Sequence, residues 1–217
     1  MQDKSNEKKK NPLKKTLVLY TMNEIEGIKS IFDRIPISLF DEFFVMDNHS
    51  DDGTVEFLEK NGIKVIQQKK PGRTNALIEA VEYAIGDIII NLSSDGNEKP
   101  EDIPKILEKF NEGYEMVTAS RFLPDSRVDL GDDKLRIRVF GNKLCTFLVN
   151  ICWGANVTDT TNGLRGITKY CYKKTKLSTF SNTENFQLTI RCAKLKIKTA
   201  EIPTKELPRI GGIVKSD

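Results

Sequence analysis

The chain has 217 residues, of which 38% are hydrophobic and 30% charged, and its net charge is +3 at neutral pH. This length and composition exclude a disordered or fibrous chain and predict one globular domain with a sizeable core. No window approaches the roughly 20 apolar residues of a membrane-spanning helix, and no signal-peptide segment follows the first lysines. We therefore expect a cytoplasmic protein.

Four cysteines and a single histidine limit the metal and redox chemistry of the chain. The cysteines stand at positions 145, 152, 171 and 192, and no two of them form a Cys-x-x-Cys pair. This spacing argues against a zinc site and against a disulfide framework, and it is typical of a reducing compartment.

The first fifteen residues are unusually basic, with lysine at positions 4, 8, 9, 10, 14 and 15. Such a segment is usually solvated and disordered, and we expect residues 1–15 to form a tail of this kind. Contact of the tail with an anionic membrane is the alternative. Nucleic-acid binding through these lysines would depend steeply on salt, and we expect no nucleic-acid partner.

Strand and helix patterns alternate from residue 16 to residue 120. Short apolar runs predict strands at residues 16–21, 43–46, 63–66, 88–90 and 116–118. Apolar residues at helical spacing predict helices over residues 25–32, 55–58 and 74–84, and a further helix from Pro100. This alternation predicts an α/β fold with a largely parallel sheet covered by helices.

The second half of the chain is less regular. Residues 122–133 lack apolar periodicity, which predicts a loop. Further on, we expect a strand at residues 164–168, a helix at 184–195 and a last strand at 197–203.

One apolar helix face stands out between these segments. Its residues recur at i, i+4, i+7, i+8 and i+11: Phe140, Leu144, Phe147, Leu148 and Ile151. The pattern predicts a helix that packs into the core. Arg136, Arg138 and Lys143 flank this face, so a helix that rests on a membrane surface is the alternative.

Three polar loops follow three of the predicted strands, at residues 21–24, 47–48 and 93–97. The carboxyl ends of parallel strands meet at one edge of a sheet, where open α/β proteins bind ligands. Asp95 is flanked by Ser94 and Asn97 and suits a hydrated divalent cation at that edge. An isolated Asp-Gly pair is also typical of a solvated turn.

Several sequence blocks, taken together and in order, resemble the family 2 glycosyltransferases, especially polyprenyl-phosphate sugar synthases such as dolichol-phosphate mannose synthase. The blocks are YTMNEIEGI, VMDNHSDDGT, GRTNALIEAVEYAIGDIIINLSSDGNEKPEDI, ASRF, RVFGNKL, VTDTTNGLRG and EIPTKELPRIGG. The resemblance implies a GT-A fold, which is a Rossmann-like, mixed and mainly parallel sheet with helices on both faces. It also implies transfer of a sugar from a nucleoside diphosphate sugar with a divalent cation.

The same resemblance implies a single domain over residues 16–212. Residues 16–120 would form its nucleotide-sugar-binding half and residues 121–212 its acceptor half, with a short tail at 213–217. The residues that match the family's nucleotide-sugar site are Thr21, Glu24, Asp47, Asn48, Arg73, Ser94, Asp95 and Arg209. Asn48 stands where a second Asp is usual, and because an amide donates as well as accepts, the donor is left open between a GDP-sugar and a UDP-sugar.

The metal motif departs from the family pattern. Ser93, Ser94 and Asp95 occupy the Asp-x-Asp position, so the first carboxylate is missing. The affinity of a site for a hard cation depends on how many carboxylates it contains. We expect Asp95, Asn97 and the donor phosphates to hold a weakly bound Mg or Mn ion.

The implied reaction is an inverting displacement at the anomeric carbon of the sugar, with a polyprenyl phosphate, dolichyl or undecaprenyl, as acceptor. The oxyanion of such an acceptor needs no general base. By the resemblance, Arg121 would hold the acceptor phosphate with help from Arg136 or Arg138, and Arg209 would stabilise the departing diphosphate.

A sugar hydroxyl of a glycan or glycolipid is the alternative acceptor. It would require a general base, and Glu184 is the candidate, although a charge at the start of a helix is the competing interpretation of that residue. The predicted function is an active hexosyltransferase of glycan biosynthesis, cytoplasmic or peripheral at the cytoplasmic face of a membrane. A nucleotide-sugar-binding or partner protein with impaired catalysis is the alternative that the missing acid favours.

Overall fold

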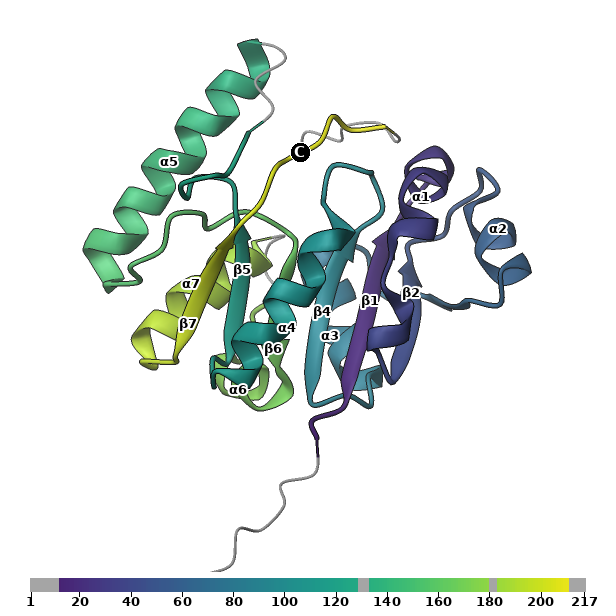
Figure 1. Cartoon of the computed structure of the whole chain (residues 1–217), viewed down its shortest axis with the longest axis horizontal. Coiled ribbons are helices and arrows are strands. Elements are labelled where there is room, and N and C mark those ends of the chain that lie inside the picture. The colour runs from purple at the N-terminus through teal and green to yellow at the C-terminus, as the bar shows by residue number, and fades with distance from the viewer. Residues whose placement is uncertain (1–11, 129–132, 180–182, 211–217) are drawn as a thin grey trace, which may run out of the picture.

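The computed structural model describes residues 12–128, 133–179 and 183–210. In this part of the chain, seven strands form one sheet with the order β3-β2-β1-β4-β6-β5-β7 (Figure 1). The strands are β1 (Lys15–Thr21), β2 (Glu42–Asp47), β3 (Lys64–Gln67), β4 (Ile88–Ser93), β5 (Met116–Ser120), β6 (Arg165–Thr168) and β7 (Thr199–Pro203).

The sheet is mixed and mainly parallel, as the sequence predicts. Strands β1 to β4 pair in parallel, and so do β5 and β7. Only β6 runs the other way within the described residues, and it pairs antiparallel with both β4 and β5. The carboxyl ends of β1, β2 and β4 therefore lie next to one another at one edge of the sheet.

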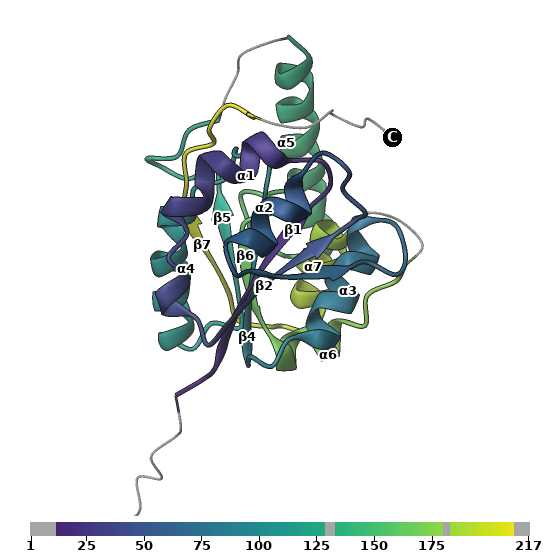
Figure 2. The ribbon, with the colours of Figure 1, turned by 90° about the vertical axis from the view of Figure 1, so that its right-hand side faces the viewer.

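Helices cover both faces of the sheet (Figure 2). The α-helices are α1 (Ile25–Ile31), α2 (Thr54–Lys60), α3 (Arg73–Tyr83), α4 (Ile103–Asn111), α5 (Asp133–Trp153), α6 (Lys169–Thr175) and α7 (Glu184–Lys194). Apolar side chains of α1, α2 and α4 fill one hydrophobic cluster, and those of α3, α6 and α7 fill the other. Helix α6 has no counterpart among the sequence predictions.

Strand β4 explains how the sequence builds this arrangement. Ile88 and Ile90 point into the first cluster, whereas Ile89 points into the second. A continuous apolar run is typical of a strand that is buried on both faces. The central place of β4 puts the polar loop that follows it in the middle of the sheet edge.

Helix α5 contradicts the prediction that residues 140–151 pack into the core. Phe140, Phe147 and Ile151 are 70%, 58% and 66% exposed. The helix instead packs against α7 and buries Thr146 and Val149. The periodicity correctly predicted a helix with one apolar face, but the two faces of the sheet are already covered by the other helices.

The predicted tail of residues 1–15 ends earlier than expected. The backbone N–H of Lys14 donates to Asp87 Oδ2 at 3.0 Å, and that of Lys15 donates to Asp41 Oδ2 at 2.8 Å. Lys15 is thus the first residue of β1, and Lys14 is held directly before it. Residues 1–11 and the predicted tail at 213–217 lie outside the described residues.

Candidate functional site

The three polar loops predicted to meet at one edge of the sheet do meet there. Tyr20 is in register with Ser93 across β1 and β4, and Thr21 is in register with Asp47 across β1 and β2. The loops that follow the three strands are thus neighbours, which confirms the predicted convergence.

A glycine brings α1 close to the loop after β4. A Cβ atom on Gly27 would stand 2.3 Å from the carbonyl oxygen of Ser94 and 3.0 Å from the Cα atom of Asp95. Any larger residue would force the helix and the loop apart, because both obstacles are backbone atoms. Gly27 therefore sets the distance between the start of α1 and Asp95.

Glu24, Asp95 and Arg209 form the charged centre of this edge. Arg209 Nη2 donates to Glu24 Oε1, and Arg209 Nη1 lies 3.7 Å from Asp95 Oδ2. Burial raises the pKa of Glu24 above its usual value, although the Arg209 guanidinium opposes this shift. The structure therefore brings together three residues assigned to donor binding, one of which is far away in the sequence.

Backbone hydrogen bonds hold the segment that carries Arg209. The N–H of Leu207 donates to the carbonyl of Asn97 at 2.9 Å, and the N–H of Ile210 donates to that of Asp95 at 3.0 Å. The segment follows β7 and crosses above the carboxyl end of β4 (Figure 1, yellow). It lies directly over the loop that carries the predicted metal ligands.

Buried polar atoms without partners concentrate at this edge. Within the described part of the chain, four buried side-chain oxygens have no hydrogen-bond partner: Thr21 Oγ1, Glu24 Oε2, Ser94 Oγ and Asn97 Oδ1. Native proteins rarely leave buried polar atoms unpaired. Thr21 is the last residue of β1 and the other three lie in the loops after β1 and β4, so this edge has hydrogen-bonding capacity that a ligand can fill.

The donor atoms suit a hard cation that is shared with a ligand. Asp95 offers a carboxylate and Asn97 an unpaired amide oxygen, and Mg²⁺ prefers such oxygen ligands. No group of three or more His, Cys, Asp or Glu side chains that would hold a metal occurs among the described residues. Phosphate oxygens would have to complete the coordination, as Mg²⁺ sites commonly require.

Glu98 is a site residue that the sequence analysis missed. Its Oε2 atom accepts from the backbone N–H of Ser93 at 2.7 Å, and its Oε1 atom accepts from Ser93 Oγ at 3.3 Å. Burial, with the negative charge of Asp95, raises the pKa of Glu98 to about 7. The structure thus places a carboxyl group directly at the serine that replaces the missing acid.

A second glycine makes room for Glu98. A Cβ atom on Gly163 would stand 2.5 Å from Glu98 Oε1 and 3.3 Å from Ser93 Oγ. The sequence signal that was available is an acid five residues after the unusual serine. Sequence spacing alone does not reveal that this side chain folds back onto the loop.

Asp47 and Asn48 occupy the turn after β2. Asp47 is fully buried, and its two carboxylate oxygens accept from the backbone N–H and the hydroxyl of Ser50. The amide of Asn48 donates to the sulfur of Met22 at 3.1 Å. In this structure Asp47 shapes the turn, and the predicted contacts of both residues with a nucleoside remain predictions.

Arg73 and Glu184, which the sequence analysis gave different roles, form an ion pair. Arg73 Nε lies 3.3 Å from Glu184 Oε1, and the hydroxyl of Thr74 donates to Glu184 Oε2 at 3.2 Å. Both carboxylate oxygens of Glu184 are therefore engaged. This arrangement agrees with the interpretation of Glu184 as a charge at a helix N-terminus, since it is the first residue of α7.

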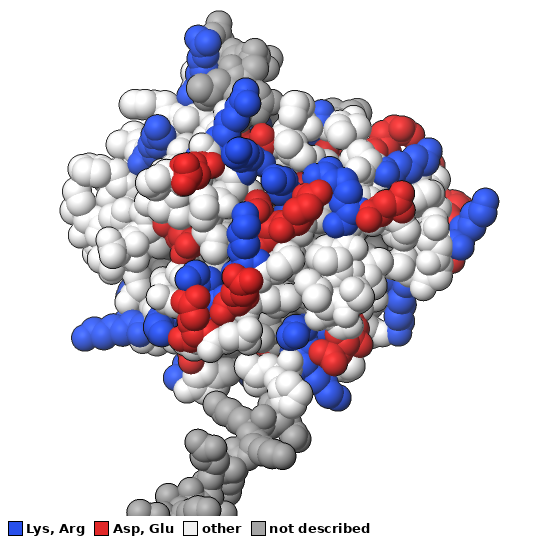
Figure 3. All heavy atoms as spheres, in the orientation of Figure 1, with Lys and Arg blue, Asp and Glu red and all other residues white. Residues whose placement is uncertain are grey.

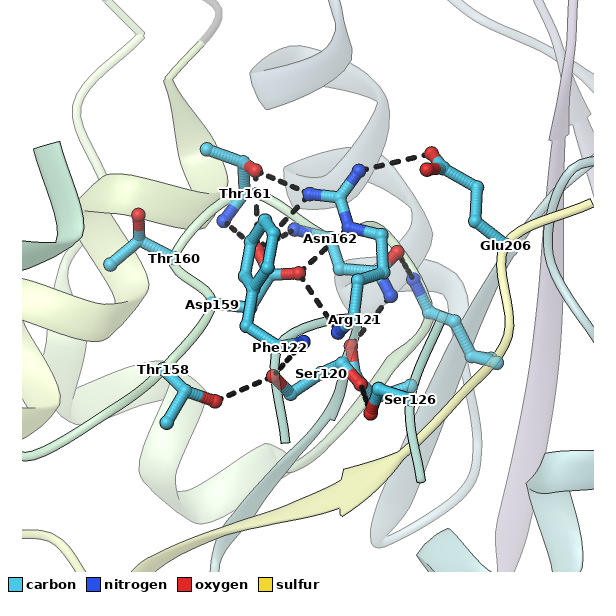
Figure 4. Close-up of polar contacts among 12 residues, drawn as sticks. Ser120, Arg121, Phe122, Ser126, Thr158, Asp159, Thr160, Thr161, Asn162 and Glu206 are labelled. Atoms are coloured by element: carbon cyan, nitrogen blue, oxygen red, sulfur yellow. Dashed lines mark hydrogen bonds and ion pairs between the residues drawn. The ribbon is translucent and has the colours of Figure 1, made fainter. Parts of the chain in front are cut away.

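Arg121 lies in a separate polar cluster at the end of β5 (Figure 4). Its Nε atom donates to Asp159 Oδ2 at 2.7 Å, and its Nη1 atom donates to Glu206 Oε1 at 3.1 Å. Its Nη2 atom donates to Thr161 Oγ1 at 2.7 Å. Burial alone would raise the pKa of Asp159, but Arg121 holds it below the usual range.

We call this group, Arg121, Asp159, Thr161 and Glu206, the Arg121 cluster. It links the end of β5, the loop after α5 and the segment after β7 that continues to Arg209. Only 13% of the Arg121 side chain is exposed. The geometry thus indicates a structural role for Arg121. Its predicted contact with an acceptor phosphate remains a prediction.

The other two arginines assigned to the acceptor phosphate lie elsewhere. Arg136 and Arg138 are exposed residues of α5. They lie on a helix that projects beyond the sheet (Figure 1), whereas Arg121 lies at a strand end. The predicted help of Arg136 or Arg138 in binding an acceptor phosphate stays a prediction.

Comparison with known proteins points to one family. The family model described as "Glycosyl transferase family 2" matches residues 17–175. Glycosyltransferase AglJ of Haloferax volcanii is 29% identical over 194 residues, which are 88% of this chain and 62% of that protein. The dolichyl-phosphate hexose transferase of the same organism is 30% identical over 202 residues, which are 90% of this chain and 83% of that protein.

A third relative matches this chain over a shorter segment. The dolichol-phosphate mannosyltransferase of Pyrococcus furiosus is 30% identical over 125 residues, which are 54% of this chain and 36% of that protein. The chain thus covers 62%, 83% and 36% of the length of these three relatives, in the order given above.

Solved structures confirm the fold. Glucosyl-3-phosphoglycerate synthase from Mycobacterium tuberculosis, in complex with Mg²⁺ and UDP, superposes with a TM-score of 0.73 at 20% identity. The match covers 91% of this chain and 72% of that chain. A complex of the same enzyme with Mn²⁺, UDP and phosphoglyceric acid gives a TM-score of 0.73 at 21% identity. The shared fold is the GT-A fold that the sequence resemblance implied.

Proposed function

Because the chain belongs to glycosyl transferase family 2, we propose that it transfers a hexose from a nucleoside diphosphate sugar to a polyprenyl phosphate with inversion at the anomeric carbon. The observation that carries the donor half of this proposal is the set of four unpaired buried oxygens beside Asp95 and Arg209. They support a polar ligand-binding site at the carboxyl edge of the sheet, where side-chain oxygens have hydrogen-bonding capacity for a ligand.

Arg209 is the residue that we expect to bind the diphosphate of the donor. Without a ligand its guanidinium is paired with Glu24 and Asp95. A guanidinium matches the geometry of phosphate oxygens, so a bound diphosphate would become its partner and release the two carboxylates. Asp95 and Asn97 would then hold the divalent cation, which neutralises the departing diphosphate.

Thr21 and Ser94 would complete the contacts to the donor. Each has a buried hydroxyl without a partner among the described residues. A hydroxyl can both donate and accept, so it suits either a ribose hydroxyl or a phosphate oxygen. UDP is the first probe because the structural neighbours contain it, and GDP is the second.

The acceptor half of the proposal rests on Glu184. An oxygen of the acceptor phosphate attacks the anomeric carbon, a new carbon–oxygen bond forms, and the bond to the nucleoside diphosphate breaks. This step moves no proton, so it needs no general base. Both oxygens of Glu184 are engaged by Arg73 and Thr74, which favours an acceptor of this kind over a sugar hydroxyl.

Two relatives support the same acceptor class by their names, which refer to dolichyl phosphate and dolichol phosphate. If the acceptor were a sugar hydroxyl, Glu184 would have to leave Arg73 to act as the base.

A binding or partner protein without catalysis is the second candidate, and the specific observation in its favour is Ser93 in place of an acid.

A transfer assay tests the proposal. The protein is incubated with Mn²⁺, a labelled UDP- or GDP-sugar and dolichyl phosphate, and the lipid product is extracted and its anomeric configuration determined by NMR. We expect a lipid-linked sugar with inverted configuration. Binding of UDP or GDP without transfer to dolichyl phosphate or to a glycan acceptor would instead support the binding protein.

A further inference from the structure

Helix α5 carries an exposed apolar face that no described residue covers. The residues of this face, which we call the α5 stripe, are Ile137, Phe140, Leu144, Phe147, Leu148 and Ile151, and each is 47% to 71% exposed. Single exposed apolar residues are normal on a protein surface, but a contiguous stripe of this size marks an interaction site.

The charged residues of α5 are basic except for the first one. After Asp133, the charged residues of the helix are Lys134, Arg136, Arg138 and Lys143, and no acidic residue follows up to Trp153. The helix therefore combines a broad apolar face with basic residues in its first half. In Figure 3 the surface over α5, on the left, is mostly white, with basic atoms near its upper end.

The length and composition of α5 suit a surface rather than a crossing of a bilayer. Its 21 residues extend about 30 Å as an α-helix. Among the described residues, no helix is both long enough and apolar enough to pass through a membrane. A helix whose exposed apolar face is flanked by basic residues suits the plane of the lipid headgroups, where apolar side chains enter the acyl boundary and basic side chains contact phosphates.

We propose that the α5 stripe docks the protein onto an anionic lipid bilayer. Phe140, Phe147 and Ile151 enter the boundary between headgroups and acyl chains, while Arg138 and Lys143 contact lipid phosphates. The docking itself does not depend on the proposed transferase activity. It deepens that proposal because it would bring a lipid-borne acceptor to the site.

The charge of α5 favours a membrane over a second copy of the chain as the partner of the α5 stripe. In a symmetric dimer the same surface of each copy forms the interface. Two α5 stripes packed together would bring two helices side by side that each carry four basic residues and only one acidic residue, Asp133. An anionic lipid surface offers the complementary charge, which attracts basic residues near it.

The position of α5 fits this orientation. Its N-terminal end projects past the carboxyl ends of the parallel strands in both ribbon views (Figures 1 and 2). The donor site lies at the same ends of β1, β2 and β4. The N-terminal end of α5 therefore lies toward the same end of the molecule as the proposed donor site.

Vesicle co-sedimentation tests the proposal without any donor or acceptor. The full chain is mixed with vesicles of phosphatidylcholine and phosphatidylglycerol, and the bound fraction is compared for wild type and the double variant Phe147→Ser with Ile151→Ser. Serine has a helix propensity close to that of phenylalanine and isoleucine, and both positions are exposed, so the helix should persist. We expect at least about a tenfold loss of partitioning, because each side chain loses a large share of its transfer free energy.

The matched control changes two exposed apolar residues elsewhere, Ile85→Ser with Leu195→Ser, which are 60% and 46% exposed. It should leave partitioning unchanged. The lysine-rich first residues are intact in every variant, so binding through them alone would make the α5 variant equal to wild type and would overturn the proposal. Sedimentation velocity without vesicles provides the other contradicting outcome, a wild-type dimer that dissociates in the α5 variant.

The charge contribution has its own test. Arg138→Gln with Lys143→Gln should weaken binding to anionic vesicles and leave the weaker binding to pure phosphatidylcholine vesicles unchanged. Lys60→Gln with Lys173→Gln, two exposed lysines on α2 and α6, serves as the control. Equal losses in the two charge variants would mean that net charge alone, and not α5, attracts the protein, and would also overturn the proposal.

Discussion

The donor edge at the ends of β1 and β4 and the Arg121 cluster at the end of β5 are built from similar residues in opposite ways. The donor edge leaves four buried oxygens unpaired and holds Arg209 between two acids. In the Arg121 cluster the arginine donates to Asp159, Thr161 and Glu206. The difference indicates that the first region has side-chain oxygens that can still bind a ligand, whereas the second region holds other parts of the fold in place.

Replacing Arg121 should have the largest effect, because the Arg121 cluster is predicted to stabilise the fold. Replacement by alanine leaves Asp159 and Glu206 without their cation, and breaking a buried pair in this way costs about 3–5 kcal/mol of unfolding free energy. Urea denaturation measures the loss. The matched control is Arg34→Ala, which removes a half-exposed pair with Glu101 at 2.6 Å and should cost about 0–1 kcal/mol. Equal losses in the two variants would contradict the structural task of Arg121.

At the donor edge the expected loss is in binding rather than in stability. Asp95→Asn should lower the affinity for nucleotide with Mn²⁺ by at least about 10- to 100-fold, because a charged metal ligand is lost. Isothermal titration with UDP and GDP measures it, with Asp33→Asn, an exposed carboxylate, as the control. Unchanged binding by Asp95→Asn would show that the metal is held elsewhere.

Glu98 allows the missing acid to be restored. Ser93→Asp alone would put a second carboxylate against Glu98, so we expect it to lower stability. Combined with Glu98→Gln, the same change rebuilds the Asp-x-Asp motif without that repulsion and should tighten Mn²⁺ binding about tenfold. Electron paramagnetic resonance of free Mn²⁺ measures the affinity. Weaker binding by the double variant than by wild type would mean that the Glu98 carboxylate itself is needed.

The smallest expected effect is in the pH dependence of stability without metal. The pKa of Glu98 rises from 4.5 to about 7 in the folded chain, so the folded state binds this proton more tightly than the unfolded state. Stability should therefore fall as pH rises from about 4.5 to 7. Thermal unfolding with a chelator should show a flatter profile for Glu98→Gln than for wild type and for Glu108→Gln, an exposed control. A profile of Glu98→Gln that matches wild type would contradict the shift.

Much of the fold could be predicted from the sequence because local patterns decide it. The apolar runs and helical spacings of residues 16–120 gave the alternating order of β1 to β5 and α1 to α4. The insertion of antiparallel β6 between β4 and β5 could not be predicted, because strand order depends on tertiary packing. Helix α5 was predicted as a helix but misplaced, since periodicity reveals an apolar face and not what covers it.

The sequence could predict which loops form the candidate site, but it could not predict which side chains form ion pairs there. Thr21, Glu24, Asp95 and Asn97 follow strands that were visible as apolar runs, so their meeting at one edge followed from parallel topology. The contact of Arg209 with Glu24 joins residues 185 positions apart. The pairing of Arg121 with Asp159 and Glu206 depends in the same way on long-range packing that no local pattern encodes.

The arginine side chains themselves provide the most direct test of the contrast between the two regions. In ¹H–¹⁵N spectra of the full chain, Mg²⁺ and UDP, or GDP in a parallel titration, are added while the Nε–H signals of Arg209 and Arg121 are followed. We expect the Arg209 signal to move as its partner changes from Glu24 and Asp95 to the diphosphate, with large backbone shifts at Thr21 and residues 94–97. The Arg121 signal should stay in place. A shift of Arg121 with Arg209 unmoved would contradict the assignment of the donor site to the ends of β1 and β4.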